Sequence, residues 1–165
     1  MTTAGRSQSI QFFTSEGKPT LDEDGMMSPP EIHPDVVDAY DFTRFVDGQR
    51  TTVIFKGEGP DGLSLVHASF GPGFRLPRHS HSADCLYYVL KGGAHLGESR
   101  VLKPGDGFFI KAEAPYTYTA GPDGIELLEF RCSTSFDMKV YDQTIERWKP
   151  IMDAVAANHD QWVVS

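Results

Sequence analysis

The chain has 165 residues and a formal net charge of −8, and 39% of its residues are hydrophobic. This length and composition suit one domain with a single core and an additional arm or tail. The negative charge and the lack of a basic cluster argue against nucleic acid or an anionic membrane as a partner. No apolar run approaches the length of about 18 residues that a membrane helix needs, so no membrane span is expected.

The N-terminal segment 1–9 lacks the apolar core of a signal peptide. The two cysteines, Cys85 and Cys132, are too few for a disulfide framework. Together these features predict a cytoplasmic protein with reduced thiols.

Residues 1–47 are expected to form an N-terminal arm. The short apolar run 10–13 predicts an edge strand or a contact with another subunit. The proline-rich stretch 28–34 cannot sustain a helix or a central strand, so it is expected to lie along the surface. Pro34 can occupy the first turn of a short helix that reaches Phe42.

Residues 48–135 consist of short apolar runs separated by glycine, proline and aspartate, which predicts an antiparallel sandwich or barrel. The expected strands are 51–55, 63–70, 86–90, 108–111, 116–119 and 125–131. Turns are expected between them, including one at 121–124, where the sequence is Gly-Pro-Asp-Gly.

Residues 136–165 are expected to form a helical tail. Apolar residues recur near helical spacing from Ile145 to Val155. Pro150 interrupts this pattern, so a kink or two short helices are expected. The apolar face is expected to pack on the outside of the barrel or on a partner subunit.

The stretch from Gly73 to Gly92 contains the closely spaced pair His79 and His81. Residues two apart in a strand point to the same face, so both imidazoles are expected to face one space, as a shared metal ion would require. Cys85 and Tyr87 have the same parity and would share that face in an unbroken strand. A turn at residues 82–84 would break this phase.

Two motifs in this region resemble those of the cupin superfamily. The first has a glycine, His-x-His, a glutamate and a second glycine, matched in register by Gly73, His79, His81, Cys85 and Gly92. The second has a Pro-Gly-Asp turn followed by a Pro-His pair, and here Pro104-Gly-Asp106 is followed by Pro115-Tyr116. The resemblance covers roughly residues 50–131. It implies an all-β, jelly-roll barrel of the double-stranded β-helix type, with an N-terminal arm and a C-terminal helix added in this chain.

The resemblance also implies a metal site, with two of its ligands replaced. His79 and His81 stand at ligand positions, where they would bind a metal ion, bind an organic ligand or line a polar pocket. Cys85 replaces the glutamate ligand. As a thiolate it would favour Zn, Fe, Ni or Cu over Mg, Ca or Mn, and otherwise it is a small core residue.

Tyr116 stands where the family has a third histidine. It would ligate the ion, act as a catalytic acid or base once the ion lowers the pKa of its phenol, or form a wall of the pocket. Tyr87 and Tyr118 are expected to line the same cavity. His67 would face either the barrel interior or the opposite face, and Arg75 could meet an acidic ligand at the rim.

Three functions follow from these residues. The first is a metal-dependent enzyme acting on a small molecule, in the range of dioxygenases, isomerases and lyases that the resemblance implies. The second is a binding or sensor protein that kept the barrel and lost the full metal site. The third is a redox-responsive role for Cys85. A homodimer is expected, with residues 5–15 or 142–157 at the contact.

Overall fold

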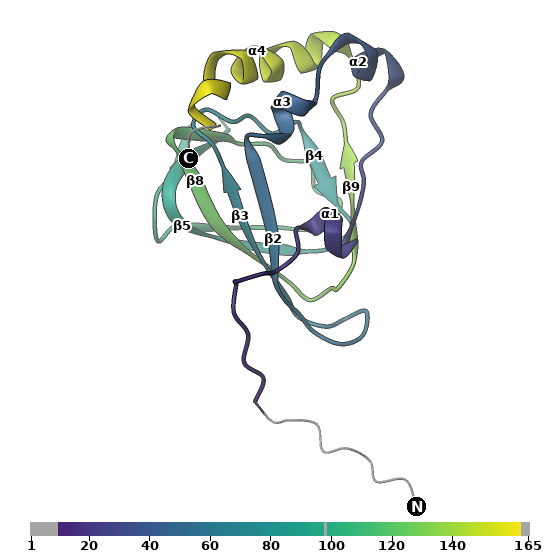
Figure 1. The fold of residues 1–165 in the computed structure, drawn as a ribbon, viewed down its shortest axis with the longest axis vertical. Helices are drawn as coiled ribbons and strands as arrows, with labels where there is room; N and C mark the ends of the chain where they lie inside the picture. Colours follow the sequence, from purple (N-terminus) through teal and green to yellow (C-terminus); the bar gives the residue numbers. More distant parts are fainter. Residues whose placement is uncertain (1–9, 98, 163–165) are drawn as a thin grey trace, which may run out of the picture.

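Two β-sheets form the body of the computed structural model, which describes residues 10–97 and 99–162. The larger sheet has the order β2-β3-β8-β5-β6, with β7 also beside β5, and the smaller sheet has the order β1-β9-β4 (Figure 1). The strands are β1 (Met27–Ser28), β2 (Gln49–Lys56), β3 (Ser64–Phe70), β4 (His79–His81), β5 (Cys85–Leu96), β6 (Arg100–Leu102), β7 (Gly107–Ile110), β8 (Thr119–Arg131) and β9 (Phe136–Val140). This arrangement confirms the predicted all-β barrel.

Strands β3, β5 and β8 alternate between buried and more exposed side chains, as strands with one face on a core must. On β8 the buried series begins with Ile125 and Leu127 and continues into two charged residues, Glu129 and Arg131. The same strand therefore supplies both the hydrophobic core and a charged end of the barrel interior.

The predicted turn at 121–124 is wrong, because β8 runs without interruption from Thr119 to Arg131. Its pairing with β5 shifts register near Gly92, so these residues bend the strand instead of ending it. Gly92 and Gly124 both have positive φ angles (67° and 71°), and a Cβ atom at Gly92 would lie 2.1 Å from the Gly124 carbonyl oxygen. Only glycine fits at this crossing.

The structure differs from the predicted strands at three further places, where a strand forms or fails to form through pairing with another segment of the chain. Residues 116–119 do not form a separate strand, and Tyr116 makes only an isolated bridge with His79. Strand β6 was not expected. Strand β9, which pairs with β4, lies beyond residue 135, where the barrel was expected to end.

The arm contains more regular structure than expected. It forms α1 (Leu21–Asp24), which begins with a capping box between Thr20 and Glu23, then β1, α2 (Pro34–Ala39) and α3 (Thr43–Val46). Helix α2 begins at Pro34, as predicted. The run 10–13 forms no strand, and its Phe12 side chain is 90% exposed. Residues 5–9 of the expected dimer contact lie outside the described residues.

The C-terminal segment forms one continuous helix, α4 (Ile145–Trp162), with Pro150 inside it. The expected division into two helices is therefore not observed, and the kink at Pro150 stays a prediction. Pro150 and Glu146, whose carbonyl lacks its usual helical partner, are both exposed, so water can satisfy that carbonyl. No helix in the described ranges is both long enough and apolar enough to cross a membrane.

Helix α4 lies across one end of the barrel, next to α2 and α3 (Figure 1). It buries Trp148, Ile151, Val155 and Trp162 in the core of its own chain. The apolar face that was a candidate for a subunit contact is therefore used within the chain. The homodimer itself stays a prediction.

Replacement of Trp148 by alanine is expected to destabilise the protein by about 3–5 kcal/mol, because it removes a fully buried indole that packs against Phe42 and Phe45. It also removes the hydrogen bond from the indole Nε1 to the Asp142 carbonyl oxygen, at 2.6 Å. Urea unfolding measures the loss. Ile145→Ala on the exposed side of the same helix is the control, with an expected loss below about 1 kcal/mol. Equal losses in both variants would show that α4 is not anchored through Trp148.

Candidate functional site

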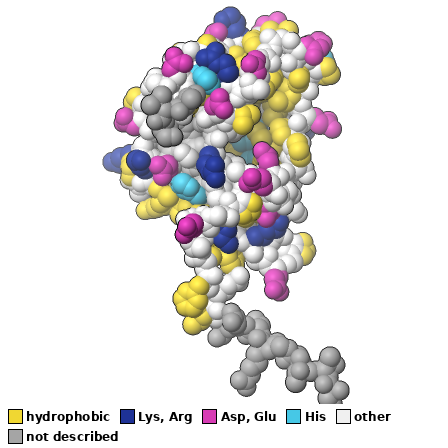
Figure 2. Space-filling model, viewed as in Figure 1, with side chains coloured by type: hydrophobic (Ala, Val, Ile, Leu, Met, Phe, Trp, Pro, Cys, Tyr) yellow, Lys and Arg dark blue, Asp and Glu magenta, His cyan; other side chains and the backbone are white. Residues whose placement is uncertain are grey.

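A cavity of about 790 Å³ extends from the interior of the barrel toward the arm, α3 and the start of β2. Figure 2 shows a hollow with hydrophobic walls on this face of the molecule. The residues at the inner end come from β4, β8, β9 and the segment before β8, and they include the following side chains: His79, His81, Tyr116, Tyr118, Glu129, Arg131 and Phe136. This volume suits a small organic molecule.

Strand β4 places His79 and His81 at the inner end of this cavity, with ring centroids 5.0 Å apart. His79 Nδ1 lies 2.8 Å from the Pro77 carbonyl oxygen, and His81 Nδ1 lies 2.9 Å from the Asp137 carbonyl oxygen. A carbonyl oxygen can only accept, so each Nδ1 carries the hydrogen and donates it. In the neutral ring, Nε2 then has a free lone pair.

Both imidazoles are neutral at physiological pH. Burial lowers the pKa of His79 to about 4, and the neighbouring His81 lowers it further. Burial also lowers the pKa of His81 to about 4, followed by the charge of Arg131. The backbone carbonyls oppose these shifts without reversing them. The site therefore offers two imidazole lone pairs that can accept a proton or bind an electrophile.

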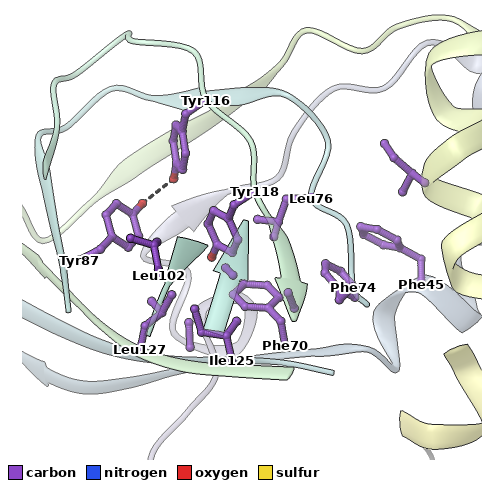
Figure 3. Close-up of a cluster of buried hydrophobic side chains, with 14 of the residues drawn as sticks. Phe45, Phe70, Phe74, Leu76, Tyr87, Leu102, Tyr116, Tyr118, Ile125 and Leu127 are labelled. Atoms are coloured by element: carbon purple, nitrogen blue, oxygen red, sulfur yellow. Dashed lines mark hydrogen bonds between the residues drawn. The ribbon is translucent and has the colours of Figure 1, made fainter. Parts of the chain in front are cut away.

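Tyr116 lies against this histidine pair, with its ring centroid 4.4 Å from that of His79. Its hydroxyl oxygen is 2.5 Å from that of Tyr87, and the two groups face each other in Figure 3. A row of aromatic side chains continues from there through Tyr118, Phe70 and Phe74 toward α3 (Figure 3).

Both phenols are held protonated. Burial raises the pKa of Tyr87 well above its usual value, and the adjacent Tyr116 adds to the effect. Burial and then the charge of Glu129 raise the pKa of Tyr116. A metal ion was expected to lower the pKa of Tyr116, but its surroundings raise that pKa. Its protonated hydroxyl therefore has a hydrogen that it can donate.

Glu129 and Arg131 are the functional candidates that sequence analysis missed. Arg131 Nη1 lies 2.6 Å from Glu129 Oε2, and the two side chains are only 1% and 9% exposed. Arg131 Nη2 donates to the Tyr87 hydroxyl at 3.4 Å, and the guanidinium lies 4.1 Å above the Phe136 ring. In the sequence, Glu129 and Arg131 continue the alternation of Ile125 and Leu127, and this alternation could have predicted that both side chains point inward.

Cys85 and Tyr87 point inward with Val89, which confirms the predicted parity. Cys85 belongs to the hydrophobic core, and its Sγ makes a contact with the Leu86 carbonyl oxygen at 3.9 Å. Burial, and then the charge of Glu129, raise the pKa of its thiol to about 12. These surroundings favour a protonated core thiol over a reactive thiolate.

Three predicted pocket residues are not among those that line the cavity. Tyr87 is buried next to Tyr116, and its hydroxyl meets that of Tyr116. His67 is on the outer face of β3, where Nε2 lies 3.5 Å from Glu126 Oε2, because the inward positions of that strand belong to Val66 and Ala68. Arg75 is exposed, between the buried Phe74 and Leu76. Tyr118, in contrast, is buried and lines the cavity as predicted.

The donors at the inner end do not fit the metal site that the cupin resemblance implies. His79 and His81 have the orientation of metal-bound histidines, with each Nδ1 held by the backbone. In the described part of the chain, however, no group of three or more His, Cys, Asp or Glu side chains is arranged to hold a metal ion. Arg131 supplies a fixed positive charge close to the pair, and Glu129 is neutralised by it. The site thus offers two neutral ligands and no available anionic one.

Comparisons with known proteins place these features in context. No protein-family model matches the sequence. The chain is 28% identical over 95 residues to the dimethylsulfoniopropionate lyase DddW of Ruegeria pomeroyi. The alignment covers 56% of this chain and 62% of the length of that enzyme.

Among solved structures, the fold is similar to that of the polyketide cyclase RemF from Streptomyces resistomycificus. The TM-score is 0.53 at 17% identity, over 66% of this chain and 84% of that one. A structure from work on the DMSP lyases RdDddP and RnDddQII aligns with a TM-score of 0.48 at 26% identity. That alignment covers 56% of this chain and 53% of the other.

The burial of Cys85 generates a direct test of its reactivity. In the native protein, a thiol reagent such as Ellman's reagent is expected to modify the exposed Cys132 rapidly and Cys85 only after denaturation. A Cys132→Ser variant should therefore show almost no reactive thiol until it is unfolded. Fast modification of the folded Cys132→Ser variant would restore the redox hypothesis for Cys85.

Proposed function

We propose that this chain, which has a cupin fold, is a lyase that acts on a small organic molecule in the barrel cavity by acid–base chemistry. One observation carries the proposal: two neutral imidazoles, each held by the backbone through Nδ1, line the cavity beside a protonated phenol. The likeness to a dimethylsulfoniopropionate lyase supports this class of reaction.

The proposed reaction is a β-elimination. The Nε2 atom of His79 or His81 takes the proton from the carbon beside an activating carboxyl or carbonyl group. The electron pair of that C–H bond becomes the new C=C bond, and the bond to the β-substituent breaks with its electrons going to the leaving group. Tyr116 donates a hydrogen bond to the oxygen on which negative charge develops.

Burial gives this arrangement its catalytic value. With a pKa of about 4 both imidazoles stay unprotonated and ready to accept a proton at neutral pH, although each is a weaker base than free imidazole. A cavity with mostly apolar walls keeps competing water from them. Each histidine ring is held by its Nδ1 hydrogen bond, so its lone pair is aimed before the substrate arrives. The Tyr87 hydroxyl fixes Tyr116 in the same way.

Exchange of His79 or His81 for asparagine is expected to lower kcat/KM by about 10²–10⁴-fold, because a positioned general base contributes about that factor. The assay follows alkene formation from dimethylsulfoniopropionate and a panel of other β-substituted carboxylates. The exposed His95, changed to asparagine, is the matched control and should retain wild-type activity. Ligand-dependent thermal stabilisation without turnover of any panel member would instead identify a non-catalytic binding protein.

A second candidate is favoured by the orientation of the histidine pair, since metal-bound histidines commonly hold the second ring nitrogen in this way. In this candidate, His79 and His81 would hold Zn, Fe, Ni or Cu, and the ion would supply Lewis-acid chemistry. The third ligand would have to come from Cys85, from Tyr116 or from the substrate.

Metal analysis separates the two candidates. For the acid–base lyase, activity should survive treatment with EDTA, and purified protein should hold well under one metal ion per chain. A stoichiometric metal whose removal abolishes activity and whose return restores it would establish the second candidate. Loss of that metal in the His79→Asn and His81→Asn variants, and not in His95→Asn, would place the ion at the pair.

A further inference from the structure

We propose that Arg131 anchors a carboxylate group of the bound molecule, so that the cavity selects small organic acids. This inference rests on the proposed small-molecule site and names the chemical class of its substrate. It starts from a side chain that is 1% exposed, lies among the cavity-lining residues and was not part of the predicted site.

The guanidinium of Arg131 has unused hydrogen-bonding capacity. Among the described residues, Nε has no hydrogen-bond acceptor, whereas Nη1 is engaged by the Glu129 carboxylate at 2.6 Å. Its hydrogen bond, from Nη2 to Tyr87, is long at 3.4 Å. A buried arginine normally uses most of its five N–H groups, so donors left without acceptors in a cavity wall indicate a missing oxygen-rich group.

The surroundings of Arg131 favour a negatively charged group as the missing hydrogen-bond partner. The cation lies over the Phe136 ring and near that of Tyr87, with Glu129 as its adjacent anion. The ion pair alone is electrically neutral, so a monocarboxylate can enter without meeting a net negative charge. A neutral ligand would satisfy the donors less well, because hydrogen bonds between ionised partners are shorter and stronger.

At the inner end of the cavity, hydrogen-bond donors and acceptors lie on different sides. Donors gather on one side, at Arg131 and in the hydroxyl pair of Tyr87 and Tyr116. The Nε2 lone pairs of His79 and His81 can only accept while the rings are neutral, and they would repel carboxylate oxygens. A bound acid would therefore place its carboxylate at Arg131 and its carbon chain toward the histidines, which is the order of groups that the proposed elimination requires.

The test compares propionate with propionamide, which has nearly the same shape and no charge. Calorimetric titration of the wild-type protein is expected to show propionate binding at least about tenfold tighter. Glu129→Gln removes the anion that competes for Arg131, so it should strengthen propionate binding several-fold and leave propionamide binding nearly unchanged. Glu126→Gln removes the same charge from the outward face of the same strand and is the matched control, with no expected effect.

The double variant Arg131→Met with Glu129→Gln removes both charges and avoids leaving one buried charge unpaired. It is expected to lose the preference for propionate. Equal affinities of the wild-type protein for the two compounds, or an unchanged preference in a folded double variant, would overturn the proposal. If neither Glu129 variant folds, the comparison of propionate with propionamide on the wild-type protein decides.

These binding measurements are independent of turnover. A clear preference for propionate in a protein that eliminates no substrate would uphold the carboxylate anchor and remove the lyase proposal. Elimination from uncharged substrates, together with no preference for propionate, would uphold the lyase proposal and remove the carboxylate anchor.

Discussion

The buried ion pair between Glu129 and Arg131 is the interaction on which the chemistry of the cavity depends. Two opposite charges remain ionised inside an apolar barrel only because each lies against the other, at 2.6 Å. Their influence extends to every polar group nearby. The charge of Arg131 contributes to keeping His81 neutral, and the charge of Glu129 contributes to keeping Tyr116 protonated. Burial is the main cause of these protonation states, and the pair reinforces them at His81 and at Tyr116.

The same pair explains why this barrel differs electrostatically from a conventional cupin metal centre. A divalent ion needs an anionic ligand, or a neighbourhood free of fixed positive charge, to offset the loss of its hydration. Here the thiol of Cys85 is protonated in the core and the carboxylate of Glu129 is engaged by a guanidinium. The guanidinium of Arg131 thus supplies, next to Glu129, the positive charge that a metal ion would supply in such a centre.

Local sequence patterns predicted the barrel and the histidine pair well. Strand alternation and turn residues depend on neighbours in the chain, and the spacing of His79 and His81 places both imidazoles on one side of an extended segment. The same parity correctly turned Cys85 and Tyr87 inward. Tyr118 was likewise placed correctly in the cavity.

The remaining features depended on contacts between distant segments. The Gly-Pro-Asp-Gly sequence at 121–124 predicts a turn by itself. Because the residues on both sides of it, Ala120 and Ile125, pair with β5, it forms instead an irregularity within β8. Glu129 and Arg131 were overlooked because charged residues in strands usually face water. The orientation of His67 was left open because the phase of an isolated strand does not say which of its faces meets the core.

The smaller sheet gives the arm a part in the site. The histidines lie on β4, which pairs with β9, and the other edge of β9 pairs in parallel with the two residues of β1. Met26, just before β1, is fully buried, and the amide of Phe136 donates to its carbonyl. The strand that bears both imidazoles is therefore held in place through a segment more than fifty residues upstream in the chain. The arm is a structural partner of the strand that bears the histidine pair, so the smallest part of the chain that can hold this strand in place begins before β1 rather than at the first long strand.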